Sequence, residues 1–429
     1  MIEPIEAVWR DEWGRLLALL VARTRRLDLA EDALADAFER AAQSWPEAGV
    51  PDNPPAWLLT AARRRVLDRL RAEAVAARKQ PLLAAEQVQG GERADDLLRL
   101  VLLAAHPSLS EEAGAALTLR LVLGISTADI ARLFLVPEPT MAARLTRARK
   151  KVVAAGVPLA VPSDEVLPQR LETVARVAYL AFTAGYAPGS GADVVRADLA
   201  GEAIRLVRLV RATGPAAGGN VALTALLALM LLQHARRGAR VDAGGGIVLL
   251  AQQDREAWNR DEIEEGLALV GELAGFRYAL VPRATRPASG ATRPAGGVAV
   301  NSALAAEYLL QALIAAEHAR AADATETDWV AIADYYRQLE DLTGSPVVRL
   351  NRAVAVAEAG DLANALGLLD GLEDALPHSH RLPAVRAELL SRAGRHTEAR
   401  AEYDVAIARC QNEPERAQLH ARRAAVHLT

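Results

Sequence analysis

The chain has 429 residues, which is too many for one ordinary hydrophobic core, and we expect two to four domains. Half of the residues are hydrophobic but only 4% are aromatic. This composition favours helices and is poor in the aromatic residues that favour β-strands. The net charge of −4 does not by itself favour nucleic acid as a partner, and the single cysteine, Cys410, excludes an internal disulfide and a thiolate-rich metal site.

The N-terminal segment is acidic and lacks the basic flank and apolar stretch of a signal peptide. No stretch of the chain reaches the ~18 uninterrupted apolar residues of a membrane span. We therefore expect a cytoplasmic protein that makes no contact with a membrane.

Two helices are predicted over residues 8–45, with a break near residues 27–28. Apolar residues such as Trp13, Leu16 and Leu20 recur at helical spacing in the first of them. Asp28 and Glu31 have the spacing of a capping box, which predicts Asp28 as the N-cap of the second helix. Residues 46–55 carry four prolines, a glycine and an Asp-Asn pair, and this composition predicts no helix there.

A third helix is predicted over residues 56–71, with Trp57 and Leu58 on its inner face and its arginines facing outward. Between Arg63 and Arg71 there are five arginines and only one acid, Asp68. Such a basic patch on a nearly neutral body can bind phosphate. Residues 75–94 are predicted to be a linker.

The stretch GISTADIARLFLVPEPTMAARLTRARKKV (124–152) has the layout of a helix-turn-helix, whose second helix enters the major groove of DNA. TADIARLF predicts a short amphipathic helix, and LVPEP predicts a tight turn, with Pro139 where a first helical residue belongs. The basic residues of the second helix favour DNA binding. The alternative is a solvated helix end, where Lys and Arg also suit the helix dipole.

From residue 157 the sequence is acidic, with 28 Lys and Arg against 33 Asp and Glu, and it is helical almost throughout. A small β-hairpin is predicted over residues 239–250, with its turn at three glycines. Residues 282–297 interrupt the helical pattern as an insert. Beyond them a 34-residue period, typical of tetratricopeptide repeats, relates Gly360 to Gly394, Ala353 to Ala387, Ala365 to Ala399 and Leu369 to Tyr403.

Three motifs together resemble regions two and four of extracytoplasmic-function sigma factors of the sigma-70 family: LAEDALADAFERAAQSW, PAWLLTAARRRVLDRLR and the helix-turn-helix. Downstream segments such as YLAFTAGY and VVRLNRAVAVAE resemble the subgroup with a long tetratricopeptide-like C-terminal extension. The resemblance implies an all-α protein without enzymatic activity or cofactor, which binds core RNA polymerase and directs it to promoter DNA. It also implies the domain boundaries: region two at 1–74, region four at 95–156, and an extension at 157–429 with repeats near 327–425.

The same resemblance assigns functional residues. It places Asp32, Asp36 and Glu39 on a helix that docks on the polymerase clamp, although plain helix solubility also explains acids there. Contacts to the minus-ten element are expected from Asp52, Asn53, Arg63, Arg64, Arg65 and Arg69. At the minus-thirty-five element Thr140, Arg144 and Arg147 are expected to face the groove, and Arg149, Lys150 and Lys151 to contact the backbone.

Several of these residues have a second interpretation. Asp52 and Asn53 could simply form the turn, and Trp57 could simply pack in the core. Pro139 and Ala142 replace residues that are often Gly and Lys in the family, and Glu138 adds an acid near the expected phosphates. These departures leave the promoter sequence open.

A one-component helix-turn-helix regulator with a repeat-type sensor domain is the alternative function, and the acidic and basic helices at 28–71 favour the sigma factor over it. We expect the extension to contact the sigma regions and to regulate them within one chain, with the direction of regulation open. No metal site is predicted, because the pair His378 and His380 has no carboxylate at ligand spacing.

Overall fold

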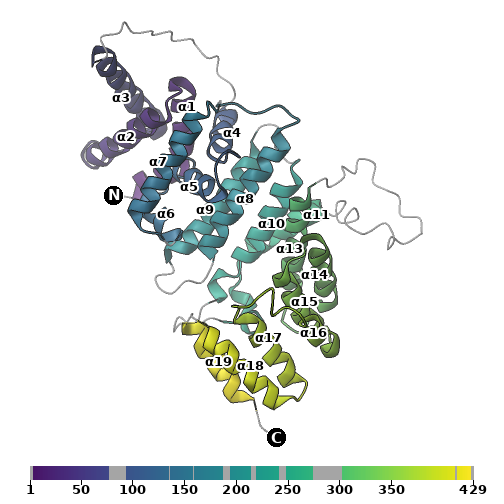
Figure 1. Cartoon of the computed structure of the whole chain (residues 1–429). Helices are drawn as coiled ribbons and strands as arrows, with labels where there is room; N and C mark the ends of the chain where they lie inside the picture. The colour runs from purple at the N-terminus through teal and green to yellow at the C-terminus, as the bar shows by residue number, and fades with distance from the viewer. Residues whose placement is uncertain are drawn as a thin grey trace. The chain divides into compact units, whose positions relative to one another are not determined.

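The structure is a computed structural model that describes residues 3–76, 93–134, 136–157, 159–186, 194–213, 219–240, 248–273, 302–410 and 413–426. Within these ranges all regular secondary structure is helical, which confirms the all-α prediction. None of the described helices has the length and apolar character needed to cross a membrane. The chain forms two compact units, Met1–Ala187 with Asp193–Asn220, and Pro188–Ala192 with Val221–Thr429 (Figure 1).

The first unit begins with a bundle of three helices around an aromatic core. Trp13, Leu16 and Leu34 are fully buried in it. Trp9 stacks on Trp13 with ring centroids 4.2 Å apart, and Phe38 meets Trp9 edge-on. The helices are α1 (Glu3–Thr24), α2 (Leu27–Ala48) and α3 (Pro54–Ala76).

The start and the end of α2 both differ from the prediction. The N-cap is Arg26, and no side chain caps the helix. Asp28 lies in the first turn and pairs with Arg26, so the predicted capping box is wrong. The helix also continues through Pro46 to Ala48. Pro46 has no N–H to donate to the carbonyl four residues earlier, but only two residues of the helix follow it.

Four further helices follow, and the last two form the predicted helix-turn-helix. The side chain of Ser126 accepts a hydrogen bond from the Asp129 N–H and so caps the third of them, and Pro139 lies in the first turn of the fourth. Ile130, Met141 and Leu145 pack the pair together from their buried faces. The helices are α4 (Arg93–Ala104), α5 (Glu111–Leu121), α6 (Thr127–Leu133) and α7 (Glu138–Ala154).

Two helices beyond residue 157 belong to the same compact unit as the helix-turn-helix. They are α8 (Leu167–Tyr186) and α9 (Val194–Ala212). The two pack on each other, and α8 also packs on α5, where Val177 is buried. The predicted division at residue 157 stays a prediction, while the compact unit itself extends to Asn220.

The second unit is built on α10 (Val221–His234), which is buried on almost every side. A helix that is apolar all round belongs in the centre of a fold, and α10 packs against two neighbours accordingly. These are α11 (Arg260–Glu272) and α13 (Ala303–Arg320). Short 3-10 turns connect α10 to α11: η2 (Arg237–Ala239), η3 (Leu250–Gln252) and η4 (Arg255–Ala257).

The predicted β-hairpin is represented only by its two ends. Its turn, residues 241–247, lies outside the described residues, and the ends form 3-10 turns rather than strands. The Val248 N–H donates to the Arg240 carbonyl oxygen at 2.8 Å. The insert at 282–297 and residues 77–92 of the linker also lie outside the described ranges.

The 34-residue period corresponds to successive helix pairs. Gly360 and Gly394 have φ values of 99° and 75° and follow two equivalent helices, a backbone conformation that favours glycine. The four alanines of the period, together with Leu369 and Tyr403, are almost completely buried. The helices are α14 (Trp329–Thr343), α15 (Pro346–Glu358), α16 (Leu362–Leu368), α17 (Arg381–Arg392), α18 (His396–Arg409) and α19 (Glu413–Ala425).

Candidate nucleic-acid and polymerase interface

The arginines of α3 differ in how far they are available to a ligand. Arg64 and Arg69 are exposed. Arg63 is half-buried, and burial together with the charge of Arg23 lowers the pKa of its guanidinium. Arg65 pairs with Asp36 of α2 at 2.5 Å. The prediction treated these arginines as one patch, whereas in this structure Arg64 and Arg69 are the two that face solvent most openly.

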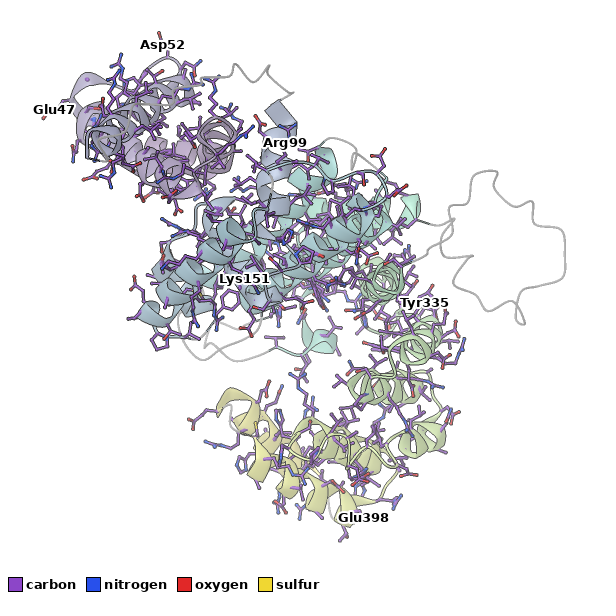
Figure 2. All side chains as sticks on the ribbon, turned by 45° about the horizontal axis from the view of Figure 1, so that its top comes forward. Glu47, Asp52, Arg99, Lys151, Tyr335 and Glu398 are labelled. Atoms are coloured by element: carbon purple, nitrogen blue, oxygen red, sulfur yellow. The ribbon has the colours of Figure 1, made fainter. Side chains whose placement is uncertain are left out.

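The loop between α2 and α3 contains Asp52 and Asn53, both exposed. The Asn53 side chain accepts a hydrogen bond from the Ala56 N–H at 3.1 Å and so caps α3. Asp52 lies at an outer end of the first three helices (Figure 2). Asn53 therefore has a structural role in its loop.

A shallow cavity of about 610 Å³ lies between α2 and α3. Trp57 forms part of its wall, is only half-buried and meets Trp45 edge-on at 5.6 Å. Arg40 and Arg64 line the same cavity. An aromatic ring can stack with a base, and the two guanidinium groups beside it can bind the adjoining phosphates. Sequence reasoning missed Arg40, which directly follows the predicted polymerase-facing acid Glu39 on α2.

The acids expected to meet the polymerase share one face of α2. Asp32 and Glu39 are exposed, while Asp36 is occupied by Arg65. A residue predicted to bind polymerase and a residue predicted to bind DNA are thus partners of each other. Asp32, Asp36, Arg65 and Arg69 also line a common small cavity between α2 and α3.

On α7, Thr140, Arg147, Lys150 and Lys151 are exposed, as a DNA-reading helix requires. Figure 2 shows Lys151 on this helix. Arg144 is half-buried, because it pairs with Glu112 of α5 at 3.0 Å and lies over the ring of Phe134.

Arg149 of α7 pairs with Glu31, the carboxylate that the sequence pattern had placed in a capping box with Asp28. Its Nη2 atom lies 2.7 Å from Oε2 of Glu31, and Nε of Arg120 lies 2.7 Å from Oε1 of the same carboxylate. The Glu31 side chain is only 6% exposed. This ion cluster joins α2 of the first bundle to α5 and α7. Glu31 lies between Leu27 and Leu34 on the buried face of α2. A charged residue on a buried helix face needs a partner, and this was the sequence signal that could have revealed the ion cluster.

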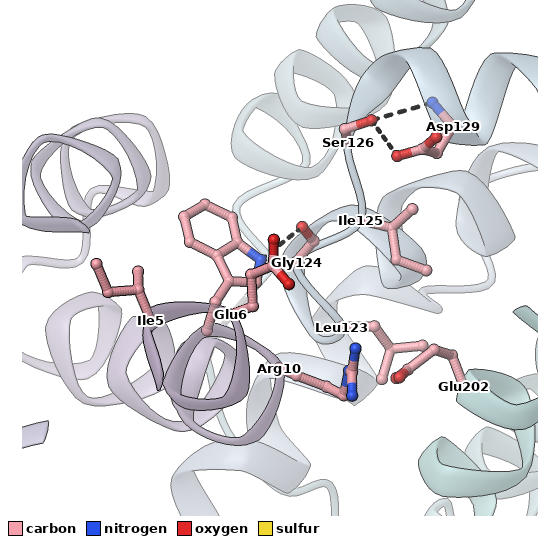
Figure 3. A pocket seen from close by; sticks show the side chains of 10 residues that line it. Ile5, Glu6, Arg10, Leu123, Gly124, Ile125, Ser126, Asp129 and Glu202 are labelled. Carbon is pink, nitrogen blue, oxygen red and sulfur yellow. Dashed lines mark hydrogen bonds between the residues drawn. The ribbon is translucent and has the colours of Figure 1, made fainter. Parts of the chain in front are cut away.

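The first bundle also meets the second set of helices through a close backbone approach. The Trp9 Nε1–H donates to the Gly124 carbonyl oxygen at 3.1 Å (Figure 3). A Cβ atom at Gly124 would lie 2.7 Å from Trp9 Nε1, and one at Gly14 would lie 2.2 Å from the Val122 carbonyl oxygen. Only glycine allows contact at these distances. A cavity of about 560 Å³ lies beside this contact.

Polar contacts join α8 to the second set of helices as well. Arg176 of α8 pairs with Glu111 of α5 at 3.2 Å. Arg170 donates to the Leu102 carbonyl oxygen, and burial lowers the pKa of its guanidinium. Burial and the charge of Arg170 together lower the pKa of His106. Region 93–154 is therefore held from two sides, by the first bundle and by α8.

Comparison with known proteins shows which families these helices match. Residues 10–75 match the family "Sigma-70 region 2", residues 99–152 match "Sigma-70, region 4", and residues 170–274 match a family of unknown function (DUF6596). The chain is 39% identical over 412 residues to uncharacterized protein R00370 of Rhizobium meliloti (strain 1021), across 94% of this chain and 90% of the relative. No solved structure matches it. The chain belongs to the sigma-70 family, whose members are transcription initiation factors that act in promoter recognition.

Proposed function

We propose that this sigma-70 family protein is an alternative sigma factor of the extracytoplasmic-function subgroup, regulated by its own C-terminal extension. Region two would bind the polymerase clamp and read the minus-ten element, and region four would read the minus-thirty-five element. The observation that carries the proposal is that each matched region contains one basic helix, α3 in region two and α7 in region four.

In region two, the cavity beside Trp57 is the proposed site for an unstacked base of the minus-ten element. The half-buried indole offers a stacking surface, and Arg40 and Arg64 offer positive charge for the adjoining phosphates. Asp52 is exposed nearby in the loop, where its carboxylate can accept hydrogen bonds from a base edge. Asn53 would act by shaping this loop.

The polymerase contact is assigned to the exposed acids of α2. Asp32 and Glu39 are seven residues apart, which places them on one face two turns apart. Opposite charge across such a surface mainly raises the association rate and fixes the register. Asp36 can join this contact only when Arg65 turns toward DNA, so polymerase and DNA binding would be linked at this ion pair.

In region four, Arg147, Lys150 and Lys151 are the proposed DNA contacts that need no rearrangement, with Thr140 at the exposed N-terminal end of α7. Arg144 and Arg149 would first have to leave Glu112 and Glu31.

We interpret the present arrangement as a closed state. Elements named for positions ten and thirty-five are centred about 25 base pairs apart, which is about 85 Å of DNA at ~3.4 Å per pair. Here α2 and α7 touch through Glu31, and a helix of about 22 residues is only about 33 Å long. Regions two and four must therefore separate before both elements can be read.

The extension is proposed to act on this separation through α8 and α9. These helices pack against α5 in the same compact unit, and Arg176 and Arg170 fix α8 to region four. An extension held in this way moves with region four when the regions part. Its contacts would then set how easily the closed state opens.

The test is run-off transcription with bacterial core RNA polymerase and the full chain on a promoter library. We expect promoter-dependent transcripts that are lost in Arg147→Ala, while Arg395→Ala, an exposed arginine of the C-terminal unit, stays as active as the natural chain. Tight duplex binding without polymerase, combined with no transcript, would instead support the one-component regulator.

A further inference from the structure

Three metal-ligating side chains meet within the second compact unit, on helices outside the segments matched to sigma regions two and four. His380 lies at the start of α17, Cys410 at the end of α18 and Glu415 in the first turn of α19. Their ligand atoms all lie within 4.8 Å of one another. Nε2 of His380 is 2.9 Å from Oε2 of Glu415. The sequence showed a histidine pair without a carboxylate, and the fold supplies the carboxylate from another helix.

The cluster has a buried side and an open side. Cys410 is 3% exposed and belongs to an apolar cluster with Tyr403 and Leu419. The side chains of His380 and Glu415 are each about one quarter exposed. An ion can therefore approach from the imidazole and carboxylate and meet the thiol at the inner end.

We propose that His380, Cys410 and Glu415 form a binding site for a divalent transition metal ion of the Zn²⁺ class. Imidazole nitrogen, thiolate sulfur and carboxylate oxygen are the donors that zinc takes, at about 2.0–2.3 Å. Around such an ion the donors would lie roughly 3.3–3.8 Å apart in tetrahedral geometry. Small side-chain rotations reach this from the present spacing. Three protein ligands leave the fourth position to water or to an added ligand.

The backbone that carries these ligands is fixed by other contacts. Arg409 donates to the Ser379 carbonyl oxygen at 3.4 Å, which ties the residue before His380 to the end of α18. Arg423 of α19 pairs with Asp404 of α18 at 2.5 Å. These contacts join α17 to α18 and α18 to α19 without the ion, and binding would need little ordering of the chain. A bound ion would join α17, α18 and α19 and stabilise the C-terminal helix.

The simpler alternative is an ion pair between His380 and Glu415 beside a cysteine that only fills the core. The two cases differ in whether the thiolate binds the ion. Co²⁺ is a suitable probe, because a cobalt–thiolate bond gives a near-ultraviolet charge-transfer band and tetrahedral Co²⁺ gives strong visible bands. Zn²⁺ then competes for the same site.

The experiment titrates metal-free full-length protein with Co²⁺ and then Zn²⁺, and follows absorbance and melting temperature. We expect one Co²⁺ per chain with a thiolate band, displaced by Zn²⁺, and a higher melting temperature with either ion. Cys410→Ser should lose the band, and His380→Gln and Glu415→Gln should weaken binding at least tenfold. His378→Gln, an exposed histidine two residues from the site, is the matched control and should bind as the natural chain does.

His380→Gln leaves the buried thiol in place, so it tests the site even where Cys410→Ser disturbs the core. The proposal is overturned by any of three results: no thiolate band in the natural chain, equal Co²⁺ affinity in Cys410→Ser, or loss of binding in His378→Gln alone. The outcome does not depend on the sigma-factor function proposed above, since transcription is not measured.

Discussion

Replacing Arg120 with Gln removes one of the two guanidinium groups that neutralise Glu31. Arg120 Nε lies 2.7 Å from the carboxylate, and the two side chains are 20% and 6% exposed. Hydrogen bonds to charged groups contribute about 1.5–3 kcal/mol at such sites. Because Arg149 still holds Glu31, we expect the closed state to lose about this much. Its equilibrium with the open state would then shift roughly 10- to 150-fold.

The assay measures the separation of regions two and four by energy transfer between dyes at Glu47→Cys and Ala155→Cys, both exposed positions. The natural Cys410 is buried. Arg120→Gln should lower the transfer efficiency and raise the apparent affinity for core polymerase, since a larger fraction of the chain is competent to bind. Arg132→Gln, which breaks an exposed pair with Asp129 in the same region, is the control and should change neither.

An Arg120→Gln protein that melts at a lower temperature yet keeps its transfer efficiency and its polymerase affinity would exclude a closed state held by this ion cluster. In that case the ion cluster would only stabilise the fold. Arg120 also donates to the Ile125 carbonyl oxygen, so some loss of stability is expected in either case. Measuring both quantities on one sample separates the two effects.

Three further predictions concern other parts of the chain. Lys151→Ala should weaken promoter binding about equally across sequences and lower the salt slope by about one, as expected for one lost phosphate contact; an unchanged slope would contradict this. Trp57→Ala should slow promoter opening by a factor that corresponds to about 1–3 kcal/mol of base stacking and leave duplex binding unchanged, and weaker duplex binding would place the defect elsewhere. Burial, with the charges of Arg236 and Arg255, lowers the pKa of His318 to about 4, so the folded state binds this proton less readily than the unfolded state. Stability from this group is complete above about pH 6.5 and is lost as the pH falls toward 4; urea unfolding should show about 2 kcal/mol of this loss between pH 7.5 and 5, which His318→Gln removes.

Local signals account for the parts of the fold that the sequence predicted. Ser126 caps α6 through a bond to a residue three positions away, and Pro139 lies in the first turn of α7. Helical spacing likewise placed Trp13 and Leu16 in the core. Such patterns depend on neighbours along the chain, so one sequence is enough to recognise them.

Glu31 shows why the rest could not be predicted. Its spacing from Asp28 matched a capping box, but its partners are Arg120 and Arg149, 89 and 118 residues away. A local pattern cannot name partners at that distance. The cluster of His380, Cys410 and Glu415 escaped prediction for the same reason, because the topology of three helices brings it together. Arg65 and Arg144 were predicted as DNA contacts from their residue type and position, whereas their pairing with Asp36 and Glu112 is visible only in the packed structure.

The glycine at position 14 has a consequence for the genetics of this protein. Alanine is favoured over glycine inside a helix by up to about 1 kcal/mol, so Gly14→Ala would strengthen α1 on its own. A methyl group there would nevertheless meet the Val122 carbonyl oxygen, a backbone atom that cannot rotate away. The substitution would thus stabilise α1 on its own and weaken the packing of the first bundle against the helices of region four. A selection for promoter output without an inducing signal should therefore recover substitutions at Gly14, and cells that carry them should express the target genes constitutively.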